Sequence, residues 1–278
     1  MKNPVLHRFL RRKVSVAAAC VLLVIVLACV LGPVFIHTDP LAQDLLQSYQ
    51  NPSAEHWFGT DNLGRDTFIR ILYGGRNSLK ISFEGVALGT VLGVLLGVCA
   101  GYFGGVVDTL ICRLVDILLA FPGLLLAIAV VAVLGNGMQN TVIAISIFSI
   151  PGMARMVRGE VLTLRNSEYI AACRVMGEGN AQIIFMHVIP NAVSQIIVNA
   201  TLSLGTAILT ASSLSFLGLG VTPPDPEWGS MLSQAREVLR SSPLQAVIPG
   251  LAITLTVMSF SLVGDGLRDA LDPRLKNV

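Results

Sequence analysis

The sequence predicts an all-α integral membrane protein with six transmembrane helices. Of its 278 residues, 53% are hydrophobic and 13% are charged, whereas about 25% of the residues in soluble domains are charged. The apolar residues form blocks without Asp, Glu, Lys or Arg at 14–36, 85–107, 117–154, 188–224 and 241–264. Because about 20 apolar residues cross a bilayer as a helix, each block is long enough for at least one span.

The blocks divide into six helices as follows. Block 14–36 follows basic residues but exceeds the roughly 7–15 apolar residues of a signal-peptide core, so we expect a retained first transmembrane helix rather than a cleaved leader. Block 85–107 gives the second helix. The turn-forming stretch LGNGMQN at 134–140 divides 117–154 into the third and fourth helices. The last two blocks give one helix each.

The distribution of Lys and Arg predicts the topology, because cytoplasmic segments carry more of them. With residues 1–13 inside, the inner side holds 13 basic residues and the outer side six. This predicts a cytoplasmic segment 1–13, an outer segment 37–84, a five-helix core 85–264 with a cytoplasmic loop at 155–190, and a cytoplasmic tail 265–278. Topology therefore explains the basic residues, and no nucleic-acid partner is expected.

Glycine recurs at every fourth position of the predicted second helix, at Gly85, Gly89, Gly93, Gly97, Gly101 and Gly105. Small residues on one helix face let another backbone approach closely in a membrane. We interpret the row as helix packing within the chain, with a subunit interface as the alternative.

Polar side chains follow the predicted fifth helix at helical spacing, at Gln195, Asn199, Ser203, Thr206, Thr210 and Ser213. Such groups face protein or water rather than lipid. This polar stripe is a candidate translocation path, and hydrogen bonds between helices are the alternative.

The sequence lacks an energy source of its own. It contains no G-x-x-x-x-G-K-[ST] motif and no ionisable residue deep within a predicted span, where ion-driven carriers place one. Neither the four histidines nor the five cysteines show metal-binding spacing. We therefore expect no metal site, no cofactor and no catalytic activity in this chain, and an energy-supplying partner subunit.

Asp61, Asn62, Gly64 and Asp66 resemble part of a calcium loop, but the later glutamate of such a loop is missing. A turn built around an ion pair of Arg65 is the expected alternative.

One stretch between the fourth and fifth helices, EYIAACRVMGEGNAQIIFMHVIPN at 168–191, is too polar to cross a membrane. As a helix, Glu168–Met176 places Tyr169, Ala172, Cys173 and Met176 on one apolar face. This face is small and has no basic belt, which favours docking in a protein groove over lying on the membrane.

The ends of this helix also carry signals. Asn166 or Ser167 is expected to cap its start, and Gly177 is expected to end it in the left-handed conformation. A second helical piece at 181–188 then leads to Pro190 and the fifth helix.

This stretch resembles the EAA loop of ABC importer permeases, E-A-A-x-x-x-G followed after a spacer by a hydrophobic residue and proline. Gly177, Ile189 and Pro190 match, whereas Ala171-Ala172-Cys173 stands where Glu-Ala-Ala is usual, so only the central alanine is retained and the glutamate that could contact an ATPase is absent. HWFGTDNLGRD (56–66), SFLGLGVTPPDPEWGSML (215–232) and GDGLRDALDPR (264–274) resemble the C-type subunit of the dipeptide/oligopeptide/nickel branch.

The resemblance implies a permease subunit of an importer in the bacterial inner membrane. Its partners would be a second homologous permease subunit, two cytoplasmic ABC ATPase subunits that bind ATP and Mg, and an extracytoplasmic solute-binding protein. Peptide-type solutes are the favoured cargo, with nickel or metal chelates as the alternative; a self-sufficient carrier or channel and a membrane-embedded enzyme are disfavoured. The implied ATPase-coupling loop contains Glu168, Tyr169, Ala171, Ala172, Cys173, Met176, Gly177, Ile189 and Pro190.

Overall fold

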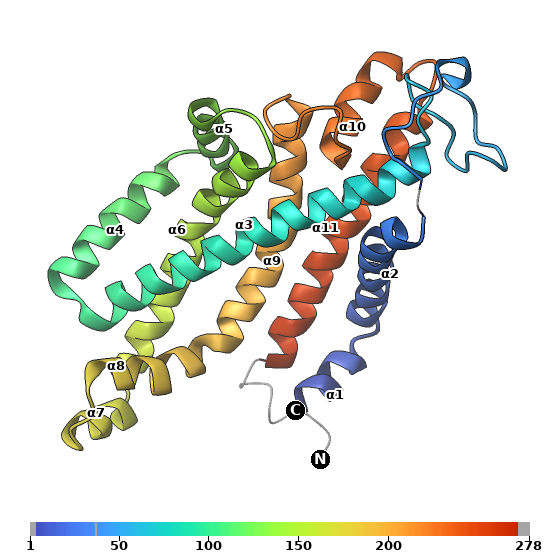
Figure 1. Cartoon of the computed structure of the whole chain (residues 1–278). Helices are drawn as coiled ribbons and strands as arrows, with labels where there is room; N and C mark the ends of the chain where they lie inside the picture. The colour runs from blue at the N-terminus through green and yellow to red at the C-terminus, as the bar shows by residue number, and fades with distance from the viewer. Residues whose placement is uncertain (1–3, 37, 272–278) are drawn as a thin grey trace.

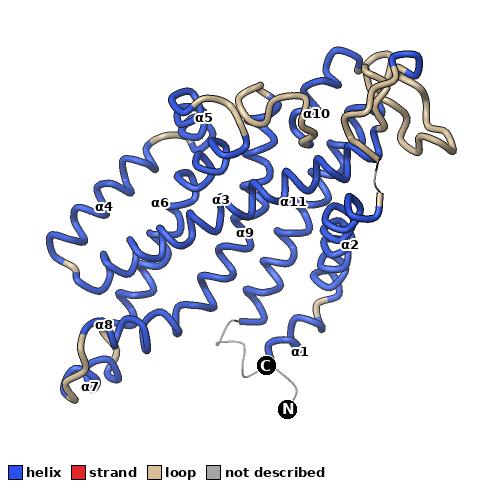
Figure 2. The backbone as a smooth tube through the Cα atoms, viewed as in Figure 1, coloured by secondary structure: helices blue, strands red, loops and turns tan. Residues whose placement is uncertain are grey.

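The computed structural model describes residues 4–36 and 38–271, and its regular elements are helices, as predicted (Figures 1 and 2). The α-helices are α1 (Pro4–Arg11), α2 (Lys13–Phe35), α3 (Thr67–Phe103), α4 (Gly105–Ala120), α5 (Gly123–Leu134), α6 (Met138–Arg165), α7 (Glu168–Val175), α8 (Asn180–Gln182), α9 (Ile189–Phe216), α10 (Trp228–Ala235) and α11 (Leu244–Leu271). Short turns of other helix types are η1 (Leu45–Gln47), the π-helix η2 (Ile183–Val188) and η3 (Arg236–Val238).

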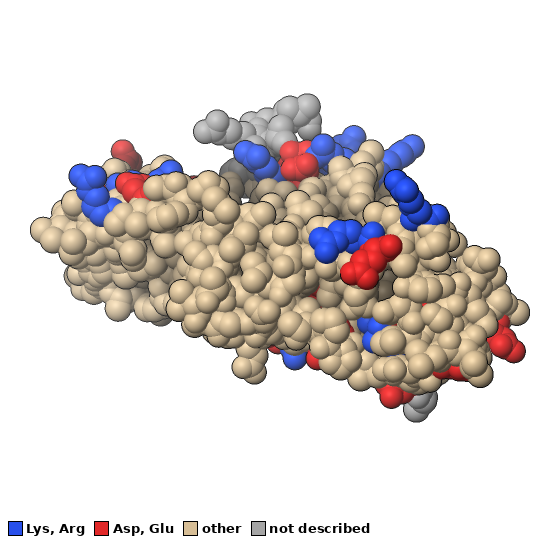
Figure 3. Space-filling view, turned by 90° about the horizontal axis from the view of Figure 1, so that it is seen from above, with Lys and Arg blue, Asp and Glu red and all other residues tan. Residues whose placement is uncertain are grey.

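Five stretches are long and apolar enough to cross a membrane: α2, α3, α6, α11 and the continuous run from α8 to the end of α9. The bent pair α4 and α5 makes a sixth if it is taken as one span. On the face seen in Figure 3, charged side chains form a few small groups on a surface that is otherwise uncharged. The structure therefore agrees with the predicted membrane protein of six spans.

The third span differs from its prediction. It was placed after residue 117, but α4 begins at Gly105, and α4 and α5 meet at 94°. The break lies at Phe121 and Pro122, where Phe121 has the extended backbone that a residue before proline prefers. The first part of this span was not predicted because α4 contains charged residues and therefore does not lie within one uncharged block. The predicted break at 134–140 is confirmed, because α5 ends at Leu134 and α6 begins at Met138.

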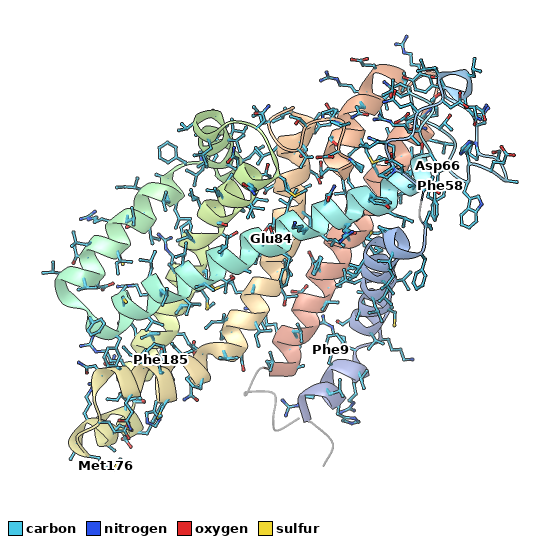
Figure 4. All side chains as sticks on the ribbon, in the orientation of Figure 1. Phe9, Phe58, Asp66, Glu84, Met176 and Phe185 are labelled. Atoms are coloured by element: carbon cyan, nitrogen blue, oxygen red, sulfur yellow. The ribbon has the colours of Figure 1, made fainter. Side chains whose placement is uncertain are left out.

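The second span also begins earlier than predicted. Its helix, α3, starts at Thr67, inside the segment expected to be an outer loop, because the Asp66 carboxylate accepts a hydrogen bond from the Ile69 N–H (3.0 Å) and caps the first turn. The first half of α3 is amphipathic, with Ile71 buried and Glu84 exposed (Figure 4). This half of α3 does not belong to an uncharged block because its exposed face carries charged residues, so the blocks alone did not predict it.

The packing centres on α3 and α6, and the second half of α3 runs against most of α6. α9 packs against α3, α6 and α11, and α2 packs against α3 and α11. A buried cluster where α10 meets α3 includes Trp228, which is 1% exposed and donates its indole N–H to the Ile71 carbonyl (3.0 Å).

The molecule has two different ends (Figure 1). One end carries α10 and the segment 38–66. The other carries α7, α8, α1 and the C-terminal end of α11, where Arg12 and Asp269 form an ion pair. The tail predicted at 265–278 is helical to Leu271, and residues 1–3 and 272–278 of the two predicted terminal segments lie outside the described residues.

Candidate functional site

The EAA-like loop folds as the helix α7, which ends in a turn that requires glycine. Gly177 has φ +87°, the left-handed conformation that the sequence predicts. The Gly177 N–H donates to the Arg174 carbonyl and the Glu178 N–H to the Cys173 carbonyl, both at 3.1 Å. This is the Schellman pair of hydrogen bonds. Of the two residues predicted to cap the start of α7, Ser167 occupies the N-cap position. Its hydroxyl donates to the Leu164 carbonyl of the preceding helix and makes no hydrogen bond that caps α7.

The predicted apolar face of α7 is divided by the structure. Cys173 turns inward with Ile170, and both pack into a buried cluster with residues of α6 and η2. Tyr169, Ala172 and Met176 are exposed instead. The single-face prediction was wrong because it overlooked Ile170, whose side chain α7 buries against its own chain.

The exposed side of the loop is more apolar than the sequence pattern indicated. We define the α7–η2 tip as the exposed residues Tyr169, Val175, Met176, Phe185 and Met186. Val175 is 89% exposed and Met176 72% exposed, and Figure 4 shows Met176 at the far end of the loop. Glu168 and Ala171 are also exposed on α7.

The expected second helical piece is present but wider than an α-helix. Residues 183–188 form the π-helix η2, in which the Ile189 N–H donates to the Ile184 carbonyl. Pro190 follows at the first turn of α9 and has no N–H to donate to the preceding turn. η2 ends at Val188 and α9 begins at Ile189, so the helical backbone continues from one into the other without a break. The hydrogen bond from Tyr102 to Asn180 (2.9 Å) ties the loop to α3.

Three chemically reactive side chains also meet in this loop, although the sequence suggested no such cluster. The donor atoms of Cys173, Glu178 and His187 all lie within 4.8 Å of one another. His187 Nε2 is 2.9 Å from a Glu178 carboxylate oxygen. Burial raises the pKa of the Cys173 thiol, and the Glu178 carboxylate raises it further.

The polar stripe of α9 is not buried within the chain. Gln195 and Thr206 are exposed, and Asn199, Ser203, Thr210 and Ser213 are half-buried. The hydroxyls of Thr206, Thr210 and Ser213 donate to carbonyls of their own helix.

Near the end of the stripe, a groove of about 430 Å³ lies between α9 and α11. Ser213 and Thr254 line it together with apolar side chains. The stripe thus leads to a partly polar groove that this single chain leaves open.

The glycine row of α3 lies against α6. A Cβ added at Gly85, Gly89, Gly93, Gly97 or Gly101 would come within 2.6–2.8 Å of an atom of α6. The row therefore serves packing within the chain at these five positions. Gly105 departs from the prediction, because it lies in the first turn of α4 with nothing within 4 Å of an added Cβ.

At the opposite end, the predicted ion pair of Arg65 is confirmed. The Asp61 carboxylate lies 2.7 Å from Arg65 Nε and 3.3 Å from Arg70 Nε, and both guanidinium groups are buried. Gly64 closes the turn with φ +72°, and an added Cβ would lie 1.7 Å from the Asp44 carbonyl oxygen. Arg70 was missed as a partner because α3 was not predicted to begin before it.

Comparison with protein families supports a transport role. The binding-protein-dependent transport system inner membrane component family matches residues 90–277, and the N-terminal TM domain of oligopeptide transport permease C matches residues 4–52.

Individual relatives match over almost the whole chain. The chain is 46% identical to the dipeptide transport system permease protein DppC of Alkalihalophilus pseudofirmus, covering 96% of this chain and 88% of that one. It is 49% identical to the glutathione transport system permease protein GsiD of Pectobacterium atrosepticum, covering 98% and 90%.

A solved structure shares the fold. An inward facing conformation of the MetNI methionine ABC transporter superimposes with a TM-score of 0.60 at 19% identity, covering 73% of this chain and 97% of the other. The family matches and the two relatives confirm the resemblance to the C-type branch. The chain therefore belongs to the family of inner-membrane permease subunits of binding-protein-dependent ABC importers.

Proposed function

We propose that this permease and a second homologous permease subunit enclose a pathway for peptide-type solutes. A solute-binding protein delivers the solute from outside, and two cytoplasmic ATPase subunits drive its passage. The cargo class is supported by the names of the relatives, which are a dipeptide permease and glutathione permeases. Dipeptides and glutathione share a peptide backbone with free carboxylate and amine groups.

The observation that carries the proposal is the apolar α7–η2 tip. An exposed group of large apolar side chains commonly marks a protein–protein contact. Val175 and Met176 project from a short helix at the end of the molecule that also carries α1 and the end of α11 (Figure 1). A short helix with an exposed apolar side fits a groove on a partner, and we assign that groove to an ATPase subunit.

A continuous helical connection would carry movement of the tip into the bundle. η2 leads directly into α9, whose polar stripe is uncovered in the single chain. Displacement of the docked tip would therefore shift the stripe. The second permease subunit would cover the open side of the stripe and the adjoining groove, so that the solute passes between the two subunits.

The test is transport by the reconstituted complex. This permease is purified with its co-encoded permease and ATPase subunits, placed in proteoliposomes and supplied with the cognate binding protein. We expect uptake of a labelled dipeptide or of glutathione that requires both ATP and the binding protein. Uptake that needs neither would favour a self-sufficient carrier. Uptake restricted to nickel chelates would show that the proposed cargo is wrong.

A further inference from the structure

Cys173, Glu178 and His187 form a compact set of metal-ligating side chains that the transport role does not use. Their donor atoms lie within 4.8 Å of one another, with Cys173 buried and the other two half-buried. A thiolate, an imidazole and a carboxylate are all ligands of zinc.

The local fold explains why the three residues meet. The Schellman turn bonds the Glu178 N–H to the Cys173 carbonyl, which brings the side chain at 178 next to the end of α7. His187 comes from η2, and its own carbonyl accepts a hydrogen bond from the Asn191 side chain (2.6 Å). Each ligand is therefore held by backbone structure rather than by a free loop.

The three side chains already lie close enough together to converge on one ion. His187 Nε2 lies 2.9 Å from a Glu178 carboxylate oxygen, and the Cys173 sulfur lies within 4.8 Å of the ligand atoms of both residues. A glutamate–histidine pair is by itself an ordinary surface contact. The buried thiol beside this pair is the additional feature, and a divalent ion would bind all three groups while the thiol proton is released to solvent.

The ligand types and their spacing favour zinc over calcium or magnesium. Zinc binds sulfur at about 2.3 Å and nitrogen or oxygen at about 2.0–2.2 Å, so the ligands of one tetrahedral ion lie roughly 3.5 Å apart. All three ligand atoms lie within 4.8 Å of one another, and the Glu178–His187 pair, at 2.9 Å, would open slightly to admit the ion. Calcium and magnesium prefer sets made only of oxygen ligands, which this set does not provide. Three protein ligands leave the fourth position of the ion to water.

We propose that Cys173, Glu178 and His187 form a zinc site that ties the end of α7 to η2. A bound ion would hold the α7–η2 tip in a fixed position relative to α9. Because the tip is proposed to couple ATP hydrolysis to transport, fixing it would restrain transport. This effect on transport rests on the proposed coupling role, whereas binding of the ion does not.

Cobalt, which reports on thiolate ligation through its ultraviolet charge-transfer band, provides the direct test. The purified full-length chain is titrated with Co²⁺, and Zn²⁺ is then added to displace it. We expect a thiolate band that Cys173→Ser abolishes and that His187→Gln weakens severalfold or more. Cys112→Ser is the matched control, because the Cys112 thiol also lies beside a carboxylate, 3.2 Å from Asp108 Oδ1. Absence of the band in the natural chain, or its survival in Cys173→Ser, would overturn the proposal.

A second measurement needs no variant of the site. Zinc should slow alkylation of Cys173 severalfold in the natural chain, while Cys112 reacts at an unchanged rate, as mapped by peptide mass spectrometry. Equal rates at Cys173 with and without zinc would refute the site. If zinc binds as expected but leaves ATP-driven uptake unchanged, the zinc site stands and its proposed restraint of transport is wrong.

Discussion

The contact between α3 and α6 should not tolerate even one added methyl group at Gly97. A Cβ there would lie 2.7 Å from the Ala154 carbonyl oxygen and 2.8 Å from Val157 Cβ, whereas ordinary contacts begin at 3.4 Å. Neither neighbour is a flexible side-chain end, so α6 itself would have to move. Overpacking of this kind costs about 1–3 kcal/mol.

Gly159→Ala in α6 is the matched control, because nothing lies within 4 Å of an added Cβ there. Both substitutions gain the same helix propensity, up to about 1 kcal/mol, so the difference between them isolates the packing cost. In a chain of this size about 1 kcal/mol shifts the melting temperature by roughly 2–4 °C. We expect Gly97→Ala to melt several degrees below Gly159→Ala in detergent, measured by size-exclusion chromatography after heating. Equal melting temperatures would refute the described contact at Gly97.

Three other predictions concern the stripe, the end of the molecule that carries α10, and the loop. Cysteines at Gln195 and Thr206 should react with water-soluble thiol reagents in the membrane-embedded complex and a cysteine at Ile197 should not; equal labelling of all three would exclude the pathway role. Glu227 is the buried N-cap residue of α10, and burial raises its pKa. Its ionised form therefore opposes folding, so the stability of the protein falls as pH rises from the ordinary carboxyl range through the raised pKa. Glu227→Gln should therefore raise the melting temperature at neutral pH and not at acidic pH, and a lower melting temperature at neutral pH would contradict this reasoning. Gly177→Val should cost about 1–2 kcal/mol in the left-handed turn and speed hydrogen exchange at the end of α7, whereas Gly177→Asn should change it little; identical exchange in both would show that the turn is not constrained.

Features that depend on local signals were predictable from the sequence. The turn at Gly177 follows from one glycine at the end of an amphipathic segment, and the break before Met138 follows from the turn-forming cluster LGNGMQN. The ion pair of Arg65 follows from an acidic residue four positions earlier in a tight turn. In each case the neighbouring sequence contains both partners of the interaction.

Features that depend on tertiary packing were not predictable in the same way. The charged half of α3 is buried in part against α10 and the segment 38–66, and no single window of sequence contains all three. Ile170 joins a cluster whose other members, apart from Cys173, come from α3, α6 and η2. Leu204 of α9 packs beside a buried cluster of α3, α6 and α9. Cys173 and His187 are brought together by a turn and a π-helix, neither of which follows from metal-binding spacing.

The central claim is that the α7–η2 tip docks on an ATPase subunit, and site-specific photo-crosslinking tests it most directly. A photoreactive amino acid replaces Met176 at the tip, or Trp57 as a similarly exposed apolar control in the segment 38–66, which lies at the opposite end of the molecule. In the assembled complex, we predict a crosslink from position 176 to the ATPase and none from position 57. A crosslink to the ATPase from position 57, or none from position 176 in a complex that retains the ATPase, would contradict the proposed coupling role.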